Sequence, residues 1–388
     1  MAIDMKLFEE GLDRKNTGCI KWDAEGSFEG KELIPMGVAD MDFASPAVVK
    51  EAIIRRAEHG AFGYCTADPA DVEAVQGWMQ RRYGLTVEKD AVLFTPGVVD
   101  SSMVATVALG KPGDKVVIMT PVYPSFFQAA NTHGLQEVRC PLIHNENGWF
   151  MDYEAIEQAF KDGAKFLMLC NPHNPVGRVW TEAELKTLVS LTKRYGVTII
   201  SDDIHADLTM PEYKVTPILS LDPTAIEMIS ATKTFNLACM RHSSVLIPDP
   251  DVRQKFQKEY SSRRIDGVNM FGRIAQTAAY NGGEEWLDAL RAYLAGTRDL
   301  TEAFLRDELP EISCSHLEAT YLMWLDCRAL GMETQEMRNW FAREAGVGFT
   351  AGTAFGVEGT GFMRMNIATP RKNVSRALEQ IKAAIRAR

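Results

Sequence analysis

Short apolar runs recur through the middle of the chain and are separated by longer segments that mix apolar and polar positions. The runs are rich in Val, Ile and Leu and are flanked by turn-forming and polar residues, a pattern typical of buried strands. Strands are predicted at 92–95, 115–119, 165–169, 197–201, 225–229 and 243–247. Between them, apolar spacing predicts helices, for example over 98–109 and 182–195. Apolar strands that alternate with helices indicate a mostly parallel sheet, buried on both faces.

Several helix boundaries are marked by capping residues. Ser45-Pro46 and Asp68-Pro69 each place a capping side chain before a proline, which predicts a helix start at both positions. The apolar patterns that follow stop at Gly60 and near Gly84. Thr181 and Glu184 have the spacing of a capping box, which predicts the start of the helix over 182–195.

The alternation of predicted strands and helices ends after Tyr280. A long helical pattern over 284–309 is followed by strand patterns near 321–325 and 363–367 and by a closing helix from about Lys372. This order indicates a smaller α+β domain, and the polar, irregular N-terminal segment is expected to join it. The chain is therefore divided into three predicted parts: an arm over 1–44, a large domain over 45–283 and a small domain over 284–388.

Composition and charge narrow the classes of ligand. The 388 residues are 46% hydrophobic, enough to bury a substantial core. The net charge of -10 and the absence of a basic cluster argue against nucleic acid and anionic membranes as partners, so a small molecule is expected. No apolar run is long enough for a bilayer, and the first thirty residues lack a signal core. Seven scattered cysteines without a C-x-x-C pair suit a cytoplasmic protein with no structural zinc.

The first candidate for chemistry is Lys233, which follows the predicted strand over 225–229. Ligands collect at the carboxyl ends of strands in open α/β sheets, where desolvation lowers the pKa of an amine and favours its attack on an aldehyde. Schiff-base chemistry is then possible, although most lysines are solvated surface residues. Ser230, Thr232 and Arg241 surround Lys233 with hydroxyl groups and a cation suited to holding phosphate.

A second anion-binding pattern begins at the strand over 92–95. Pro96-Gly97 follows this strand and leads into an apolar helix, so the backbone N–H groups of Gly97, Val98 and Val99 lie near a helix N-terminus. Free N–H groups and the helix dipole favour phosphate there. Many such turns only reverse the chain, but the hydroxyl groups and the cation around the lysine favour phosphate binding.

These motifs resemble those of a known family. Ser-x-x-Lys with an arginine eight residues beyond the lysine is similar to the cofactor segment of fold-type I pyridoxal-phosphate enzymes, the aspartate aminotransferase superfamily. Three longer motifs resemble its MalY/PatB group of carbon–sulfur β-lyases: G-V-A-D-M-D-F from Gly37, C-N-P-H-N-P from Cys170 and S-A-T-K-T-F-N from Ser230. The resemblance spans about 38–371. It implies the aspartate aminotransferase fold with a seven-stranded sheet, bound pyridoxal 5'-phosphate, and a homodimer with shared active sites.

The resemblance also assigns residues to the cofactor ring. It implies that Asp202 keeps the ring nitrogen protonated, in preference to Asp203, because a second ring-binding residue is expected three positions on, at His205. Asn174 matches the asparagine that binds the ring oxygen O3′ and also contacts substrate, and Tyr123 matches the aromatic residue that stacks on the ring. From the residues alone, Asp202 is as readily a helix cap, Asn174 a turn residue and Tyr123 a core side chain.

Three further positions follow from the resemblance. Tyr64 matches a tyrosine that reaches the phosphate bound in the neighbouring subunit; the alternative is a solvated loop tyrosine. Arg364 matches the arginine that binds the substrate α-carboxylate; the alternative is a surface salt bridge. Val38 is expected to contact substrate.

The implied reaction is the α,β-elimination of cystathionine or a related cysteine S-conjugate to thiol, pyruvate and ammonia, with Lys233 as the base that removes the Cα proton. The main alternative is an aminotransferase on the same scaffold, because both reactions begin with the loss of that proton. A binding protein that retains only the fold is a third possibility, against which the intact lysine, aspartate and arginine positions argue.

Overall fold

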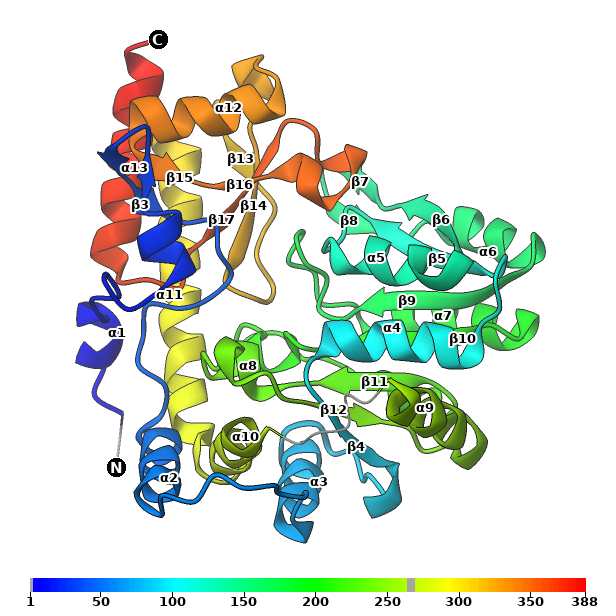
Figure 1. Ribbon diagram of the computed structural model, residues 1–388. Coiled ribbons are helices and arrows are strands. Elements are labelled where there is room, and N and C mark those ends of the chain that lie inside the picture. The colour runs from blue at the N-terminus through cyan, green and yellow to red at the C-terminus, as the bar shows by residue number, and fades with distance from the viewer. Residues whose placement is uncertain (1–2, 264–268) are drawn as a thin grey trace.

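The computed structural model describes residues 3–263 and 269–388 and contains a central sheet of seven strands (Figure 1). The strand order is β4-β12-β11-β10-β9-β5-β6. The bounds are β4 Val92–Thr95, β5 Lys115–Thr120, β6 Gln136–Pro141, β9 Ala164–Cys170, β10 Thr198–Asp202, β11 Ile226–Ile229 and β12 Ser243–Leu246. Only β12 runs antiparallel to its neighbours β11 and β4, so the mostly parallel sheet is confirmed. The six predicted strands agree with the structure to within one residue at each end.

The seventh strand, β6, was not predicted. It lies at the edge of the sheet, pairs only with β5, and reads Gln-Glu-Val-Arg-Cys-Pro, with only Cys140 buried. Edge strands face water along one side and carry charged residues, so they lack the continuous apolar run on which the prediction relied.

Helices cover both faces of this sheet, which explains the apolar character of its strands. Neighbouring residues in β5 point to opposite faces: Val116 belongs to a core with α4, α5 and α9, whereas Val117 belongs to a core with α3, α6, α7 and α10. The helix bounds are α2 Ala47–Glu58, α3 Pro69–Tyr83, α4 Val98–Leu109, α5 Ser125–Asn131, α6 Tyr153–Lys161, α7 Glu182–Tyr195, α8 Ala231–Thr234, α9 Pro250–Ser262 and α10 Met270–Gly282.

The predicted helix starts have different outcomes. Asp68 accepts a hydrogen bond from the Ala70 N–H and begins α3, and Thr181 forms a capping box with Glu184 at the start of α7, as predicted. The prediction for Ser45 is wrong, because α2 begins after Pro46 without a side-chain cap from the described residues. The Ser45 hydroxyl instead donates to the carbonyl of Asn236, at 3.5 Å.

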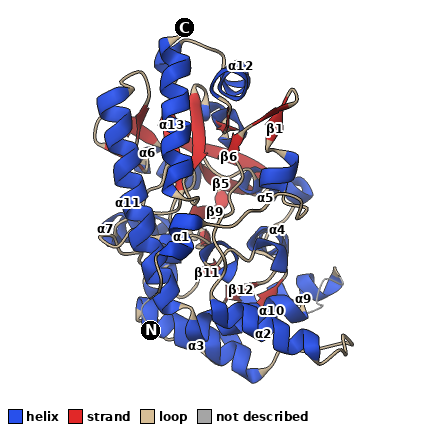
Figure 2. Ribbon diagram, turned by 90° about the vertical axis from the view of Figure 1, so that its left-hand side faces the viewer, coloured by secondary structure: helices blue, strands red, loops and turns tan. Residues whose placement is uncertain are grey.

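The C-terminal part contains a second, antiparallel sheet with the order β13-β14-β17-β16. Its elements are β13 Ser313–Cys314, β14 Leu322–Asp326, β16 Thr350–Ala351 and β17 Phe362–Asn366, with helices α11 Glu284–Glu308, α12 Thr334–Trp340 and α13 Arg371–Arg386. The long helix α11 lies beside α13 and also contacts α10, so it links the two parts of the chain (Figure 2).

The N-terminal segment packs against the C-terminal part. Its strand β3, Ile34–Pro35, pairs in parallel with β15, Val347–Gly348. The segment expected to be irregular also contains a short helix, α1 Lys6–Glu10, whose Phe8 ring packs edge-on against Phe43, with ring centres 5.2 Å apart. Short hairpins are formed by β1 Ser27–Phe28 with β2 Lys31–Glu32 and by β7 Ile143–Asn145 with β8 Gly148–Phe150. Within the described ranges, no helix combines the length and the apolar character needed to cross a bilayer.

Candidate active site

A cavity of about 250 Å³ lies at the carboxyl ends of β9, β10 and β11 and at the N-terminus of α4. Ligands bind at this edge of open α/β sheets, since the loops that follow the strands leave a crevice there. Ten of the predicted site residues line the cavity: Gly97, Val98, Val99, Tyr123, Asn174, Asp202, His205, Thr232, Lys233 and Arg241. The sequence therefore identified most of the wall of this cavity.

Lys233 extends from the single turn of α8 that follows β11. The turn is capped by Ser230, whose hydroxyl accepts a hydrogen bond from the Thr232 N–H at 3.1 Å and donates to the carbonyl of His242 at 2.8 Å. The Lys233 amine donates to the carbonyl of Ala39 at 2.7 Å. Burial, with a further contribution from the Arg364 cation, lowers the pKa of Lys233 to about 8. The amine therefore loses its proton much closer to neutral pH than an ordinary lysine does.

Two adjacent aspartates lie at the end of β10: Asp202 is its last residue and Asp203 follows it, and of the two only Asp202 lines the cavity. Its carboxylate accepts a hydrogen bond from the Ile204 N–H at 3.1 Å, and burial raises the pKa of Asp202 to about 6. Asp203 is turned away, accepts hydrogen bonds from the Ser201 hydroxyl and from the Asn171 amide, and is 3% exposed. Of the two carboxylates, Asp202 is the one that a ligand in the cavity can reach.

Arg364, on β17, is buried beside the cavity. It donates to the Asn174 side-chain oxygen at 3.3 Å and to the Gly37 carbonyl at 3.1 Å, and its ring contact is Phe355, 4.8 Å from the guanidinium carbon. In the part of the chain that the structure describes, no carboxylate forms an ion pair with it, its Nε has no hydrogen-bond partner, and burial lowers its pKa to about 10. The alternative of a surface salt bridge is therefore wrong. A buried cation with a spare donor is suited to binding a carboxylate.

His205 provides a second buried polar group with spare hydrogen-bonding capacity. Its Nδ1 atom has no partner among the described residues. Burial, together with the neighbouring Lys233 and Arg364 cations, lowers the pKa of His205 to about 3, so the ring is neutral at physiological pH. A neutral imidazole can accept or donate one hydrogen bond to a ligand atom.

The anion-binding features meet at the start of α4. No described side chain caps this helix at Gly97, so the N–H groups of its first turn, which includes Val98 and Val99, remain available. The Arg241 guanidinium lies 3.6 Å from the carboxylate of Asp100 in that turn and is largely exposed. A helix N-terminus beside a cation is suited to a phosphate group.

Four predicted site residues do not line the cavity. Ser230 caps the α8 turn from behind, Arg364 reaches the cavity through Asn174, and Val38 lies behind Ala39, which lines it. Tyr64 lies in the loop between α2 and α3, is fully exposed, and does not line the cavity of its own chain.

Sequence reasoning also missed residues of the wall, and Cys170 is the clearest case. It ends β9 as Asp202 ends β10, so the same rule about the carboxyl ends of strands applies to it. Burial raises the pKa of its thiol well above the usual value, so Cys170 contributes a neutral, apolar surface.

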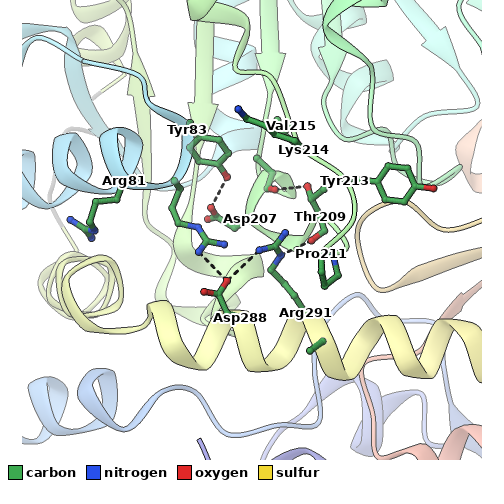
Figure 3. Close-up of a pocket in the computed structure, with 13 residues that line it drawn as sticks. Arg81, Tyr83, Asp207, Thr209, Pro211, Tyr213, Lys214, Val215, Asp288 and Arg291 are labelled. Atoms are coloured by element: carbon green, nitrogen blue, oxygen red, sulfur yellow. Dashed lines mark hydrogen bonds and ion pairs between the residues drawn. The ribbon is translucent and has the colours of Figure 1, made fainter. Parts of the chain in front are cut away.

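A larger cavity of about 540 Å³ lies elsewhere, between α3 and α11 (Figure 3). Its guanidinium groups are already paired with a carboxylate: Arg82 and Arg291 lie 3.0 Å and 3.2 Å from Asp288. Its lining includes neither Lys233 nor any residue of the central strands. The smaller cavity is therefore the candidate active site.

Comparison with known proteins shows the family to which the chain belongs. Residues 31–381 match the family Aminotransferase class I and II. The chain is 37% identical over 384 residues to cystathionine beta-lyase PatB of Bacillus subtilis (strain 168), with 97% of this chain and 99% of that protein covered. It is 30% identical over 385 residues to protein MalY of Escherichia coli (strain K12), with 98% and 99% covered.

Among solved structures, the chain is similar to cystalysin from Treponema denticola, a structure that contains pyridoxal 5'-phosphate, with a TM-score of 0.95, 32% identity and 100% of each chain covered. A PLP-bound C-S lyase from Staphylococcus hominis gives a TM-score of 0.90 at 32% identity, with 97% of each chain covered. The resemblance drawn from the motifs around Lys233 is confirmed. The chain belongs to the aminotransferase class I and II family.

Proposed function

We propose that this protein is a pyridoxal-phosphate-dependent carbon–sulfur β-lyase that converts cystathionine, or a related cysteine S-conjugate, to thiol, pyruvate and ammonia. One observation carries the proposal. A single cavity brings together an amine of depressed pKa, a buried carboxylate and a free helix N-terminus, and a buried arginine that forms no ion pair with a described residue contacts Asn174 in its wall. The similarity to PatB and cystalysin supports elimination at the β-carbon in preference to transamination.

The residues fit pyridoxal 5'-phosphate, which combines a phosphate, a pyridine nitrogen, an aldehyde and a ring oxygen. The free N–H groups at the start of α4 would hold the phosphate, and the unpartnered Nδ1 of His205 is available to the ring oxygen. The further groups that would hold the cofactor are Ser230, Thr232 and Arg241 at the phosphate, Tyr123 at the ring face, Asn174 at the ring oxygen, Asp202 at the ring nitrogen and Lys233 at the aldehyde.

When bound, the cofactor withdraws electrons from the substrate Cα and makes its proton acidic. Lys233 is the group in the cavity that can accept this proton, because its pKa of about 8 leaves part of the amine neutral at physiological pH. Asp202 would hold a proton at the ring nitrogen of the bound cofactor. Arg364 binds the substrate α-carboxylate and so orients the Cα–H bond, with Val38 and Asn174 beside it. The electron pair left on Cα expels the β-thiolate, and one water is consumed when pyruvate and ammonia are released.

The test is to supply the purified protein with pyridoxal 5'-phosphate and cystathionine and to assay thiol, pyruvate and ammonia. A lyase releases the three in equal amounts without an added 2-oxo acid. An aminotransferase instead consumes a 2-oxo acid and releases no thiol, and a binding protein yields no product. Lys233→Ala is the matched control and should lose both the activity and the adduct trapped by borohydride. An adduct that maps to another lysine contradicts the assignment of Lys233.

We further propose that the enzyme is a cytoplasmic homodimer in which Tyr64 contributes to the partner subunit's phosphate site. The full exposure of Tyr64, with Phe62 60% exposed in the same loop, supports a contact between subunits. The scattered cysteines suit a reducing compartment. We also propose the division into an arm over 1–44, a large domain over 45–283 and a small domain over 284–388; the pairing of β3 with β15 supports the attachment of the arm to the small domain.

A further inference from the structure

The buried carboxylate of Asp207 connects two helices of the large domain: α8, which carries Lys233, and α3. We propose that Asp207 is a positioning residue that, through Thr234, holds the α8 turn in place and keeps the Lys233 amine shielded from bulk water. The inference rests on the proposed function, in which Lys233 is the reacting amine, but the contacts that carry it do not depend on a bound cofactor.

The α8 turn needs anchors because it contains only four residues. A single helical turn is unstable by itself, since nucleation fixes several residues for one hydrogen bond. Ser230 anchors the start of the turn through its bonds to the Thr232 N–H and the His242 carbonyl. At its end, the Thr234 hydroxyl donates to Asp207 Oδ2 at 3.0 Å. Lys233 lies between these two anchors.

Asp207 accepts hydrogen bonds from two other side chains, both on α3. The Tyr83 hydroxyl donates to Oδ1 at 2.6 Å, and the Trp78 indole N–H lies 3.1 Å from Oδ1 and 3.3 Å from Oδ2. Figure 3 shows the Tyr83 hydroxyl directed at this carboxylate above α11. Three donors converge on one side chain, an arrangement that favours the acceptor-only, ionised form of Asp207.

No lysine or arginine among the described residues forms an ion pair with Asp207, which is 8% exposed. The charged and titratable groups that face it are the Arg82 cation, itself paired with Asp288, and the neutral phenols of Tyr83 and Tyr280. Burial raises the pKa of Asp207 above its usual value. A buried charge is costly, and here three hydrogen bonds and the nearby Arg82 cation compensate it in part. We infer that the buried carboxylate serves to hold α8 against α3, because its hydrogen bonds join these two helices.

The consequence for Lys233 follows from the cause of its low pKa. Because burial is the main reason that the amine titrates at about 8 and not at 10.5, an α8 turn that moves away and admits water should let the pKa of Lys233 rise. The Thr234 hydroxyl is the group that transmits this restraint, since it joins Asp207 to the residue next to Lys233.

The test measures the pH midpoint of Lys233 acetylation by trace acetic anhydride in the cofactor-free protein, read by mass spectrometry with the exposed Lys165 as internal reference. Thr234→Val removes the hydroxyl with little change in volume and should raise the midpoint by about one pH unit or more. Thr234→Ser keeps the hydroxyl and should leave the midpoint unchanged. Tyr83→Phe removes another bond to the same carboxylate, and should lower the melting temperature while changing the midpoint less than Thr234→Val does.

An unchanged midpoint in folded Thr234→Val, or an equal shift in Tyr83→Phe and Thr234→Val, overturns the positioning role. If Thr234→Val does not fold, Thr234→Ala and Asp207→Asn provide the same comparison, and failure of all three while Thr234→Ser folds means that the bond serves stability alone. The proposed function is tested separately, by lyase activity of the wild-type enzyme. If Thr234→Val shifts the midpoint but the wild-type enzyme has no lyase activity, the positioning role of Asp207 is supported and the proposed lyase reaction is refuted.

Discussion

Replacing Lys233 by methionine should stabilise the cofactor-free protein at neutral pH. The pKa of Lys233 is about 8 in the folded state against 10.5 for an ordinary lysine. The difference of roughly 2.5 units corresponds to about 3 kcal/mol by which folding disfavours the ammonium form. Methionine has a similar length and no charge to desolvate. It also loses the hydrogen bond to the Ala39 carbonyl, worth about 1 kcal/mol, and water that enters the cavity reduces the penalty further, so about 1 to 2 kcal/mol remain.

The sign of the pH dependence follows from proton binding. Between pH 8 and 10.5 the unfolded chain binds a proton at Lys233 that the folded protein does not, so wild-type stability gains a contribution that increases with pH through this window. Below pH 8 the penalty is present in full. The advantage of Lys233→Met should therefore be largest at pH 7 and should shrink as the pH rises towards 10.

The assay is thermal unfolding of both cofactor-free proteins, followed by circular dichroism at several pH values from 7 to 9.5. With an unfolding entropy of roughly 2.1 cal/mol/K per residue, 388 residues give about 0.8 kcal/mol/K, so the variant should melt about 2 °C higher at pH 7. Lys165→Met, at an exposed position in β9, is the control and should show no such gain. A Lys233→Met protein that melts below wild type at pH 7, or an advantage that does not change with pH, would refute a burial-depressed amine.

Four further outcomes are expected. Asp202→Asn should retain the cofactor, measured by absorbance, while kcat falls by about 100-fold or more, because the ring nitrogen loses its partner; near-normal turnover would remove this role. Arg364→Lys should raise KM for cystathionine on the order of tenfold, because an ammonium group cannot replace a bidentate guanidinium; an unchanged KM would move the carboxylate site elsewhere. Mixing inactive Tyr64→Ala and Lys233→Ala chains should restore activity if two subunits share each site; exchanged chains that recover nothing would show that one chain builds it. Burial raises the pKa of Glu227 to about 7, so wild-type stability falls as the pH rises from 4.5 to 7, and Glu227→Gln should melt higher than wild type at pH 8, with no such advantage at pH 4.5.

The sequence was informative where structure and chemistry depend on neighbouring residues. The strands that end at Cys170, Asp202 and Ile229 could be predicted because both faces of a parallel sheet are buried, so each strand is a continuous apolar run. The residues that follow such strands lie at one edge of the sheet. For this reason the sequence alone could predict that Asp202 and Lys233 lie in the same cavity.

Burial and contacts between residues far apart in sequence decided which side chains belong to the site, a question that the sequence left open. Asp202 and Asp203 are identical in type and adjacent, and the resemblance favoured Asp202 without a local reason. In the structure the alternation of side chains beyond β10 turns one towards the cavity and the other towards Asn171. The Ser45 side chain was misread because its partner, the carbonyl of Asn236, is 191 residues away in sequence, and β6 was missed because an edge strand lacks the continuous apolar run of a buried strand.

The sequence by itself therefore determined the order of the elements, the mostly parallel sheet and the chemistry of the strand ends, since these follow from local periodicity and turn residues. Only the tertiary structure decided which groups are buried and what they contact. Arg364 forms no ion pair with a described residue, and β17 brings it beside Asn174, 190 residues away in sequence. Asp207 joins Trp78, 129 residues away, to the turn of Lys233. Such contacts depend on the path of the whole chain, and burial then sets the pKa values on which the proposed reaction depends.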